Sequence, residues 1–272
     1  MGSVNLDNTG SGSAITLSSD GTSLLLDGTA IGGGGADLYA ANESSPTAQP
    51  SATGANAIAI GDSAVSSGAD GIAIGLGATQ TASHNSGANA IAIGANTVAD
   101  GYSTAIGAGT GSNKTTASGN SCLAIGYTAT STGTLATAIG KSRASGTESF
   151  AANIDNNTTS YGATSVGGIA MGELTKSTGA NSISMGKSTI ASGQYGVSLG
   201  LSNTVSGQYS IAIGYNSTAN HTMSASIGAS VNSTGSYQVN IGSTIQEVRI
   251  SEAYTLPSDD GTASGQVLTT NG

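Results

Sequence analysis

The sequence has few of the side chains with which an enzyme of its length builds a core and an active site. Of 272 residues, 4% are aromatic, 8% are charged, one is Cys and none is Trp. A soluble enzyme usually carries about 25% charged residues and enough large apolar side chains to fill one thick core. Gly, in contrast, accounts for 43 residues. This composition excludes one thick core and favours a thin core that is repeated along a solenoid.

Three further scarcities narrow the function classes. The chain has only six Lys and Arg residues, and its net charge is −9. Binding of a phosphate backbone needs clustered cations, so we expect no nucleic-acid partner. Cys122 is the only cysteine, so no disulfide framework exists, and we expect its thiol to be a small buried hydrophobe. No run of about 18 apolar residues occurs, so we expect no membrane insertion.

What the chain does contain is a short motif that returns at a fixed spacing. The motif is a large apolar residue, a small residue, a second large apolar residue and Gly. From Gly172 to Gly242 the spacing is 14, five times in succession, and earlier spacings are 14, 19, 13, 19 and 14. Weaker copies end at Gly107, Gly140 and Gly228. The clear copies are Ile58–Gly61, Ile72–Gly75, Ile91–Gly94, Leu123–Gly126, Ile169–Gly172, Ile183–Gly186, Val197–Gly200, Ile211–Gly214 and Val239–Gly242.

A unit of this length suits two short strands and two turns. Apolar and small residues alternate with the period of two that is typical of strands, and a second Gly often follows half a unit after the motif Gly. We therefore predict a parallel β-roll of about thirteen coils between Asn56 and Gln246, roughly 60 Å long at about 4.8 Å per coil. The two longer spacings predict short insertions near His84–Ser86 and Lys114–Ala117.

The first strand of each unit is apolar or small on both faces, which is typical of a strand with another layer on each side. We expect the small position to face the lumen and the large row to face neighbouring chains, although the reverse assignment is open. The second strand mixes small apolar residues with Ser, Thr and Asn, so it predicts the solvent-facing sheet. The residues of the large row, which we predict to form the trimer contact or the core, are Ile60, Ile74, Ile93, Ile125, Met171, Met185, Leu199, Ile213, Ile227 and Ile241.

The repeat resembles the head repeat of trimeric autotransporter adhesins, the YadA-like left-handed parallel β-roll. The segment Gly54–Gly68, GANAIAIGDSAVSSG, is similar to that repeat almost residue for residue, and the resemblance extends over the whole of the predicted roll. It implies an all-β fold in which three rolls lie side by side as a parallel homotrimer. It also implies an extracellular or cell-surface adhesin without catalytic activity. A bacterial adhesin head fragment is therefore one interpretation of the chain.

The segments outside the repeats resemble tail-fibre proteins of marine, cyanophage-type phages. The resemblance covers Val248–Gly261 and Gly265–Gly272 as connectors and Ile15–Ile31 as an upstream strand-rich segment. It implies a location in a virion, with other fibre or virion proteins as partners, and a chain that is a fragment or a processed product. The predicted segments are 1–31, strand-rich; 32–53, a Gly/Pro/Ser linker; 54–246, the β-roll; and 247–272, a connector.

No metal or cofactor site is expected. Gly32–Asp37 fits one copy of a calcium-binding nonapeptide, but that site needs tandem copies, so we interpret it as linker. His84 and His221 are the only imidazoles, and His221 falls where other units place a turn Gly.

One phase of the repeat carries aromatic residues. Tyr195, Tyr209 and Tyr237 share it, Met223 occupies it between the last two, and Tyr102 falls there too. Stacked rings at one corner are typical of a structural ladder, but a partly exposed ladder can also stack on sugar rings. Gln194 and Gln208 precede two of the tyrosines. The candidate ligand surface is Tyr102, Tyr195, Tyr209, Tyr237, Gln194 and Gln208.

Catalysis is not expected. A glycosidase needs two carboxylates a few ångströms apart, and we expect no convergence among Asp62, Asp70, Asp100, Glu148, Asp155 and Glu173.

The leading interpretation is a phage structural fibre or adhesin whose polar surface attaches multivalently to host cell-surface glycan. An ice- or mineral-binding solenoid would need a regular Thr array, which is broken here. A polysaccharide depolymerase would need larger coils and an acidic cleft.

Overall fold

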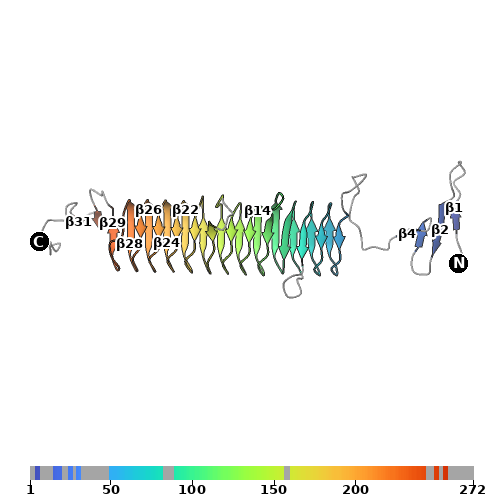
Figure 1. Ribbon diagram of the computed structural model, residues 1–272, viewed down its shortest axis with the longest axis horizontal. Coiled ribbons are helices and arrows are strands. Elements are labelled where there is room, and N and C mark those ends of the chain that lie inside the picture. The colour runs from blue at the N-terminus through green and yellow to red at the C-terminus, as the bar shows by residue number, and fades with distance from the viewer. Residues whose placement is uncertain are drawn as a thin grey trace. The chain divides into compact units, whose positions relative to one another are not determined.

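The computed structural model describes residues 4–6, 15–19, 24–26, 29–31, 49–81, 89–155, 160–242, 248–250 and 254–256. The chain divides into two compact units, Met1–Ser45 and Pro46–Gly272. In the described residues all regular structure is β-strand (Figure 1). A helix long and apolar enough to cross a membrane is absent from this part of the chain.

The first unit contains a four-stranded antiparallel sheet in the order β1-β2-β3-β4. Strand β2 lies within the predicted strand-rich segment Ile15–Ile31, as do β3 and β4. Gly32–Asp37 and most of the predicted linker lie outside the described residues. The strands of the sheet are β1 (Val4–Leu6), β2 (Ile15–Ser19), β3 (Leu24–Leu26) and β4 (Thr29–Ile31).

The second unit is a parallel β-solenoid, as predicted, built of a 13-stranded and a 12-stranded sheet. Successive coils contribute one strand to each sheet, so the strands follow one another along the rod in Figure 1. The 13-stranded sheet consists of β6 (Ile58–Ile60), β8 (Ile72–Ile74), β10 (Ile91–Ile93), β12 (Thr104–Ala108), β14 (Leu123–Tyr127), β16 (Thr137–Ile139), β18 (Phe150–Ala152), β20 (Ile169–Met171), β22 (Ile183–Lys187), β24 (Val197–Leu201), β26 (Ile211–Tyr215), β28 (Ala225–Ala229) and β29 (Val239–Ile241).

The 12-stranded sheet is made of shorter strands from the polar half of each coil. Its first strand, β5, pairs with β7, so the ladder starts at Ser51, just before the predicted start of the roll. Its strands are β5 (Ser51–Ala52), β7 (Val65–Ser66), β9 (Thr79–Thr81), β11 (Thr97–Asp100), β13 (Thr115–Ala117), β15 (Thr130–Ser131), β17 (Arg143–Ala144), β19 (Gly162–Ala163), β21 (Lys176–Ser177), β23 (Ile190–Ala191), β25 (Thr204–Val205) and β27 (Thr218–Ala219).

Strands β30 (Val248–Ile250) and β31 (Tyr254–Leu256) form an antiparallel pair within the segment that the sequence assigns to a connector. The solenoid itself is described as far as Gly242, so the predicted end at Gln246 lies outside the described residues.

The structure corrects the placement of one insertion. Thr115 pairs with Thr97, so Lys114–Ala117 is not inserted: β13 is a regular strand, and the extra residues precede it. They form a turn in which Thr110 and Asn113 bridge each other. The other predicted insertion, His84–Ser86, falls outside the described residues between β9 and β10.

A further coil has no copy of the motif in the sequence. Strand β18 pairs with β16 on one side and β20 on the other, yet its coil has Asn153 where the others have Gly. Asn153 adopts a φ of +55°, a conformation that Asn tolerates better than most residues. The long interval between Gly140 and Gly172 is therefore two coils.

The lumen is lined by small residues, which settles the open assignment of the first strand. From Ala73 to Ser226, the middle residue of each triplet in the 13-stranded sheet is Ala or Ser and is fully buried. The large residues on either side of it point outward and stay partly exposed, as at Ile125, which is 37% exposed. Alternation with a period of two makes this separation of faces unavoidable.

In three of the C-terminal coils, serine replaces alanine in the lumen, at Ser184, Ser198 and Ser226, and hydrogen bonds compensate for the burial of its hydroxyl. Ser184 Oγ lies 2.9 Å from Thr189 Oγ1, and Ser198 Oγ donates to the carbonyl of Asn203 at 3.2 Å. The Asn203 amide donates to the carbonyls of Leu199 and Gly214 and accepts from the N–H of Ser217. Because each of these buried polar groups has a partner, a polar lumen can replace an apolar one at little cost.

Cys122 is buried, as predicted, with 3% of its surface exposed. Its Sγ lies 3.4 Å from Ser103 Oγ and 3.3 Å from the carbonyl oxygen of Ser131. We expect a thiol reagent to modify Cys122 on the order of a thousandfold more slowly than in the unfolded chain, which corresponds to an opening free energy of about 4 kcal/mol. Absorbance with a disulfide reagent, with and without guanidinium, measures this. Equal rates would show that these coils open freely.

Candidate attachment surface

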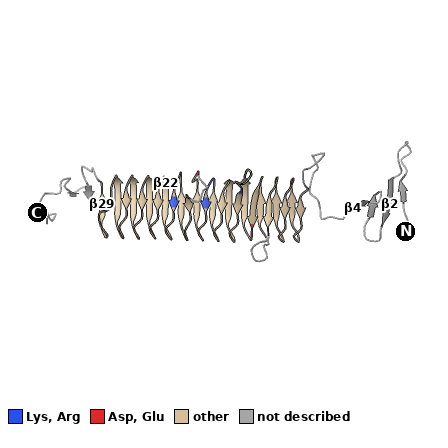
Figure 2. Ribbon diagram, viewed as in Figure 1, with Lys and Arg blue, Asp and Glu red and all other residues tan. Residues whose placement is uncertain are grey.

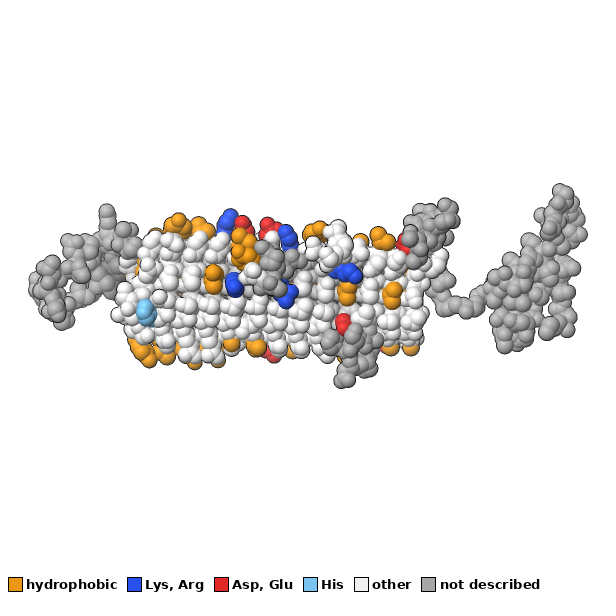
Figure 3. All heavy atoms as spheres, viewed as in Figure 1, with side chains coloured by type: hydrophobic (Ala, Val, Ile, Leu, Met, Phe, Trp, Pro, Cys, Tyr) orange, Lys and Arg blue, Asp and Glu red, His pale blue; other side chains and the backbone are white. Residues whose placement is uncertain are grey.

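The solenoid presents two sheet faces and two corners to its surroundings, and each carries a different chemistry. We call the outward side chains of the 13-stranded sheet the apolar face and those of the 12-stranded sheet the polar face. In the view of Figure 3, hydrophobic side chains gather along the two long edges, and the face between them is mostly other side chains and backbone. Each surface is built by the strict register of the coils.

The apolar face contains the whole predicted large row. Strand pairing places its members in one column, Ile60 beside Ile74 and Ile213 beside Ile227, with Ala152 as its one small member among the paired strands. Exposure in the column reaches 40% at Ile139 and 44% at Ile241. A continuous apolar stripe of this length is rare on a monomer and marks an interface.

At one corner lie the predicted tyrosines. The rings of Tyr195 and Tyr209 stack with their centroids 5.0 Å apart and their planes 6° apart. Next to them, Gln208 Nε2 donates to Gln194 Oε1 at 2.8 Å. Met223 and Tyr237 continue the same corner in the next two coils, where the N–H of Met223 donates to the carbonyl of Gln208. We call these residues the Tyr corner: Gln194, Tyr195, Gln208, Tyr209, Met223 and Tyr237.

Tyr102 has the predicted phase but is not part of this group. It lies at the corner before β12, whereas Tyr195 lies before β24, and five strands of the same sheet separate the two. Smaller or different residues occupy the corner in between, including Leu135, Glu148 and Asn181, all with positive φ. At about 4.8 Å per coil, Tyr102 is roughly 29 Å from Tyr195.

The Tyr corner places large side chains at positive φ in successive coils. Tyr195, Tyr209, Met223 and Tyr237 have φ between +53° and +61°. Asn and Asp tolerate this conformation, and other coils use them, as at Asn56 and Asp70. A large side chain there costs on the order of 1–3 kcal/mol. Tyr195, Tyr209 and Tyr237 are 42%, 47% and 78% exposed, so packing of the core does not require them.

The opposite corner has exposed residues that the sequence interpretation missed. They directly follow the motif Gly and extend the strands of the apolar face: Tyr127 and Tyr215 are each 53% exposed, and Leu201 pairs in register with Tyr215. The signal that could have revealed them is the position immediately after each motif Gly.

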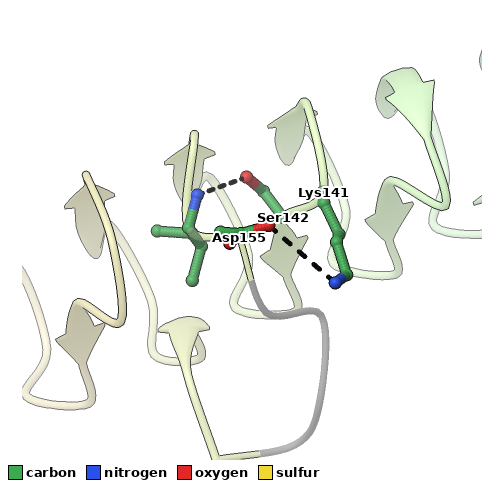
Figure 4. Close-up of polar contacts among 4 residues, drawn as sticks. Lys141, Ser142 and Asp155 are labelled. Carbon is green, nitrogen blue, oxygen red and sulfur yellow. Dashed lines mark hydrogen bonds and ion pairs between the residues drawn. The ribbon is translucent and has the colours of Figure 1, made fainter.

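Two ion pairs lie at this same corner in the middle of the solenoid. Lys141 Nζ is 3.8 Å from Asp155 Oδ1, and Lys187 Nζ is 2.8 Å from Glu173 Oε2. Figure 4 shows the first pair beside Ser142, whose Oγ accepts the N–H of Ile154 at 3.1 Å. The coils of Asp155 and Glu173 are neighbours, because the N–H of Leu174 donates to the carbonyl of Ile154.

The sequence did not reveal that Asp155 and Glu173 lie in neighbouring coils, because the coil with Asn153 in place of Gly escaped detection. Asp155 and Glu173 are 74% and 47% exposed, and each is paired with a lysine. A general acid needs an enclosed, apolar setting that keeps it protonated, which these side chains lack.

The histidines and acidic residues form no metal site in the described part of the chain. His221 occupies the turn phase predicted for it, and its Nδ1 lies 3.0 Å from Ser233 Oγ. His84 lies outside the described residues.

The polar face follows the second strand of each coil. Its outward column contains threonines at Thr79, Thr116, Thr130, Thr204 and Thr218. The column is interrupted by apolar and charged members, namely Val65, Val98, Arg143, Gly162, Lys176 and Ile190.

Comparison with known families identifies the repeat. A family model described as the YadA head domain repeat matches residues 52–78, 86–110, 117–142, 163–189 and 191–229, which together make up more than half of the chain. No curated protein matches the sequence significantly.

Proposed function

We propose that this chain, which belongs to the family of YadA head domain repeats, forms a non-catalytic homotrimeric fibre segment that attaches to cell-surface glycan. Adhesin heads of this family are extracellular and generally trimeric. The single observation that carries the proposal is the apolar face, a register-matched column of large side chains that runs the length of the solenoid and is left partly exposed by one chain.

Three chains side by side would cover this surface. Burial of an Ile, Leu or Met side chain contributes about 1.5–3 kcal/mol, and the column repeats such a residue in nearly every coil. The polar face, rich in Thr and Ser, would stay in water on the outside of the trimer. This arrangement gives three identical outer surfaces, so weak contacts to a repetitive ligand gain strength by avidity.

The Tyr corner is the surface that we assign to the glycan. Stacked, partly exposed tyrosine rings offer flat apolar faces on which pyranose rings stack, while the neighbouring glutamine amides donate and accept hydrogen bonds. The strain of large side chains at positive φ supports this role, because Asn would hold the same turn at lower cost. Tyr102 would be a separate single contact.

We expect the double variant Tyr195→Asn/Tyr209→Asn to bind immobilised neutral polysaccharide about tenfold or more weakly, because each ring contributes about 1 kcal/mol per site. The same turn already holds Asn at Asn181, so the fold should persist. Surface plasmon resonance on mannan, galactan, cellulose and dextran measures the loss. Leu135→Asn, at the same corner away from the tyrosines, is the matched control and should bind as the parent does. Equal binding by the double variant would remove the Tyr corner from the proposal.

The fibre has two candidate locations. The resemblance of the segments outside the solenoid to phage tail-fibre connectors favours a virion, where other fibre proteins would be its neighbours. Membership of the adhesin family favours a bacterial cell surface. Peptide mass spectrometry of purified phage particles and of outer-membrane fractions separates the two, because the chain would be enriched in only one of them.

A further inference from the structure

The stacked tyrosines also have the geometry of a modification site. We propose that one-electron oxidation of Tyr195 and Tyr209 joins their rings by a carbon–carbon bond, which staples two successive coils of one chain to each other. The bond itself depends only on how the rings are placed, whereas its effect on attachment rests on the glycan role proposed above for the same residues.

The two rings are held together by the register of the coils. Tyr195 and Tyr209 occupy the same place in successive coils, and the N–H of Tyr209 donates to the carbonyl of Gln194 at 2.9 Å. The backbones are therefore one coil spacing apart, about 4.8 Å. The ring centroids lie 5.0 Å apart and the planes are 6° from parallel. A tilt of the rings therefore brings the carbons beside the two hydroxyl groups within reach of each other.

The reaction balances with a peroxide as the oxidant. Each phenol loses one electron to the oxidant and its hydroxyl proton to water, which leaves a phenoxyl radical with spin on the two carbons beside the oxygen. Two such radicals form one carbon–carbon bond between these carbons. The hydrogen on each bonded carbon then leaves as a proton and each oxygen regains one, so both phenols are restored. In sum the pair loses two electrons and two protons, and hydrogen peroxide takes them up to become two water molecules.

The surroundings of the pair leave the phenols open to this reaction. Both rings are partly exposed, and neither hydroxyl has a hydrogen-bond partner within the described part of the chain. No charged residue occurs between Ser188 and Gly242, and the ribbon in Figure 2 is tan between β22 and β29. A neutral oxidant therefore meets no fixed charge in these coils, and no lysine or arginine of these coils covers the rings.

The remaining tyrosines are too far from one another to react in the same way. Tyr237 is two coils beyond Tyr209, with Met223 between them, and so lies about 10 Å away. Tyr127 and Tyr215 share the opposite corner, but five strands of the same sheet separate them. Reaction within a stacked pair has an effective concentration far above that of a reaction between molecules, so the bond should form at this pair first.

The bond would act as a staple. Tyr195 and Tyr209 are 14 residues apart, and strands β24 and β25 lie between them. A crosslink stabilises the folded state by restricting the unfolded chain. We expect the amide hydrogens of β24 and β25 to exchange about tenfold or more slowly once the bond has formed. Rings that are joined at their edges no longer stack in parallel, so the flat surface assigned to the sugar would be lost.

Oxidation with a peroxidase and hydrogen peroxide tests the site. We expect dityrosine fluorescence, a chain mass lower by two hydrogen atoms, and a crosslinked peptide that contains both Tyr195 and Tyr209. The rate should not depend on protein concentration, because the reaction occurs within one chain. Tyr209→Phe keeps the ring but removes the phenol, so the yield should fall about tenfold or more. Tyr215→Phe removes an exposed phenol at the opposite corner, is the matched control and should react as the parent does.

Hydrogen peroxide without the peroxidase should oxidise Met223 to its sulfoxide without joining the rings. An unchanged yield in Tyr209→Phe, or chains joined only to other chains on a denaturing gel, would overturn the site. The attachment role is tested separately, by adding mannan before the oxidant. Slower bond formation in mannan supports both proposals. A bond that forms at the same rate with and without any neutral polysaccharide supports the modification site and contradicts the glycan role of the Tyr corner.

Discussion

Replacement of Gly200 by valine is expected to destabilise the solenoid by about 4 kcal/mol and to uncouple the coils on its two sides. Gly200 has a φ of +119°, and a Cβ atom there would overlap the carbonyl oxygen of Gly214 in the next coil. A β-branched residue at such a φ costs about 1–3 kcal/mol. The overlap adds about as much, because the obstructing atom is backbone held by the inter-coil ladder. Thermal melting followed by circular dichroism measures the loss.

Gly111→Val is the matched control. Gly111 also has a positive φ, +56°, but a Cβ atom there would meet nothing within 4 Å. Its expected cost is the local strain alone, about 1–2 kcal/mol. Hydrogen exchange should localise the effect of Gly200→Val to strands β22–β28 and leave β6–β14 protected, because each coil contacts only its neighbours. Equal destabilisation by the two substitutions would mean that the close stacking of coils at the motif Gly contributes nothing.

The solenoid could be predicted because its rule is local and repeated. An Ile-Ala-Ile-Gly strand that returns at a short, constant interval leaves only the thin, parallel stack, although which of its two faces lines the lumen was settled only by the burial of the small middle residue. The coil that could not be predicted is the one whose sequence departs from this motif. With Phe150 in the first place, Ala152 in the third and Asn153 for Gly, that coil shares only its small middle residue, Ala151, with the motif. Only strand pairing revealed it.

The candidate sites divide in the same way. Phase alone grouped Tyr195 with Tyr209, since one regular step of the repeat separates them, and it also included Tyr102, which is in phase but about 29 Å distant.

Charges placed on the apolar face are expected to convert the proposed trimer into monomers. Ile125→Asp/Ile213→Asp removes two side chains that are 37% and 38% exposed in one chain and puts carboxylates at two separated levels of the column. In a trimer, six carboxylates would then lose water without gaining a partner, at a cost of several kcal/mol each. Sedimentation equilibrium should give one chain mass of 25.9 kDa for the variant and three times that for the parent.

The matched control carries the same charges on the opposite sheet. Thr130→Asp/Thr218→Asp places two carboxylates on the polar face at comparable levels, so it should stay trimeric with an unchanged strand signal in circular dichroism. The comparison separates the interface from general charge repulsion, because the net charge of both variants is the same. If Ile125→Asp/Ile213→Asp remains trimeric, the three chains contact one another through another surface. If both variants dissociate, the added net charge alone is enough to separate the chains. The apolar face would then no longer be supported as the trimer interface.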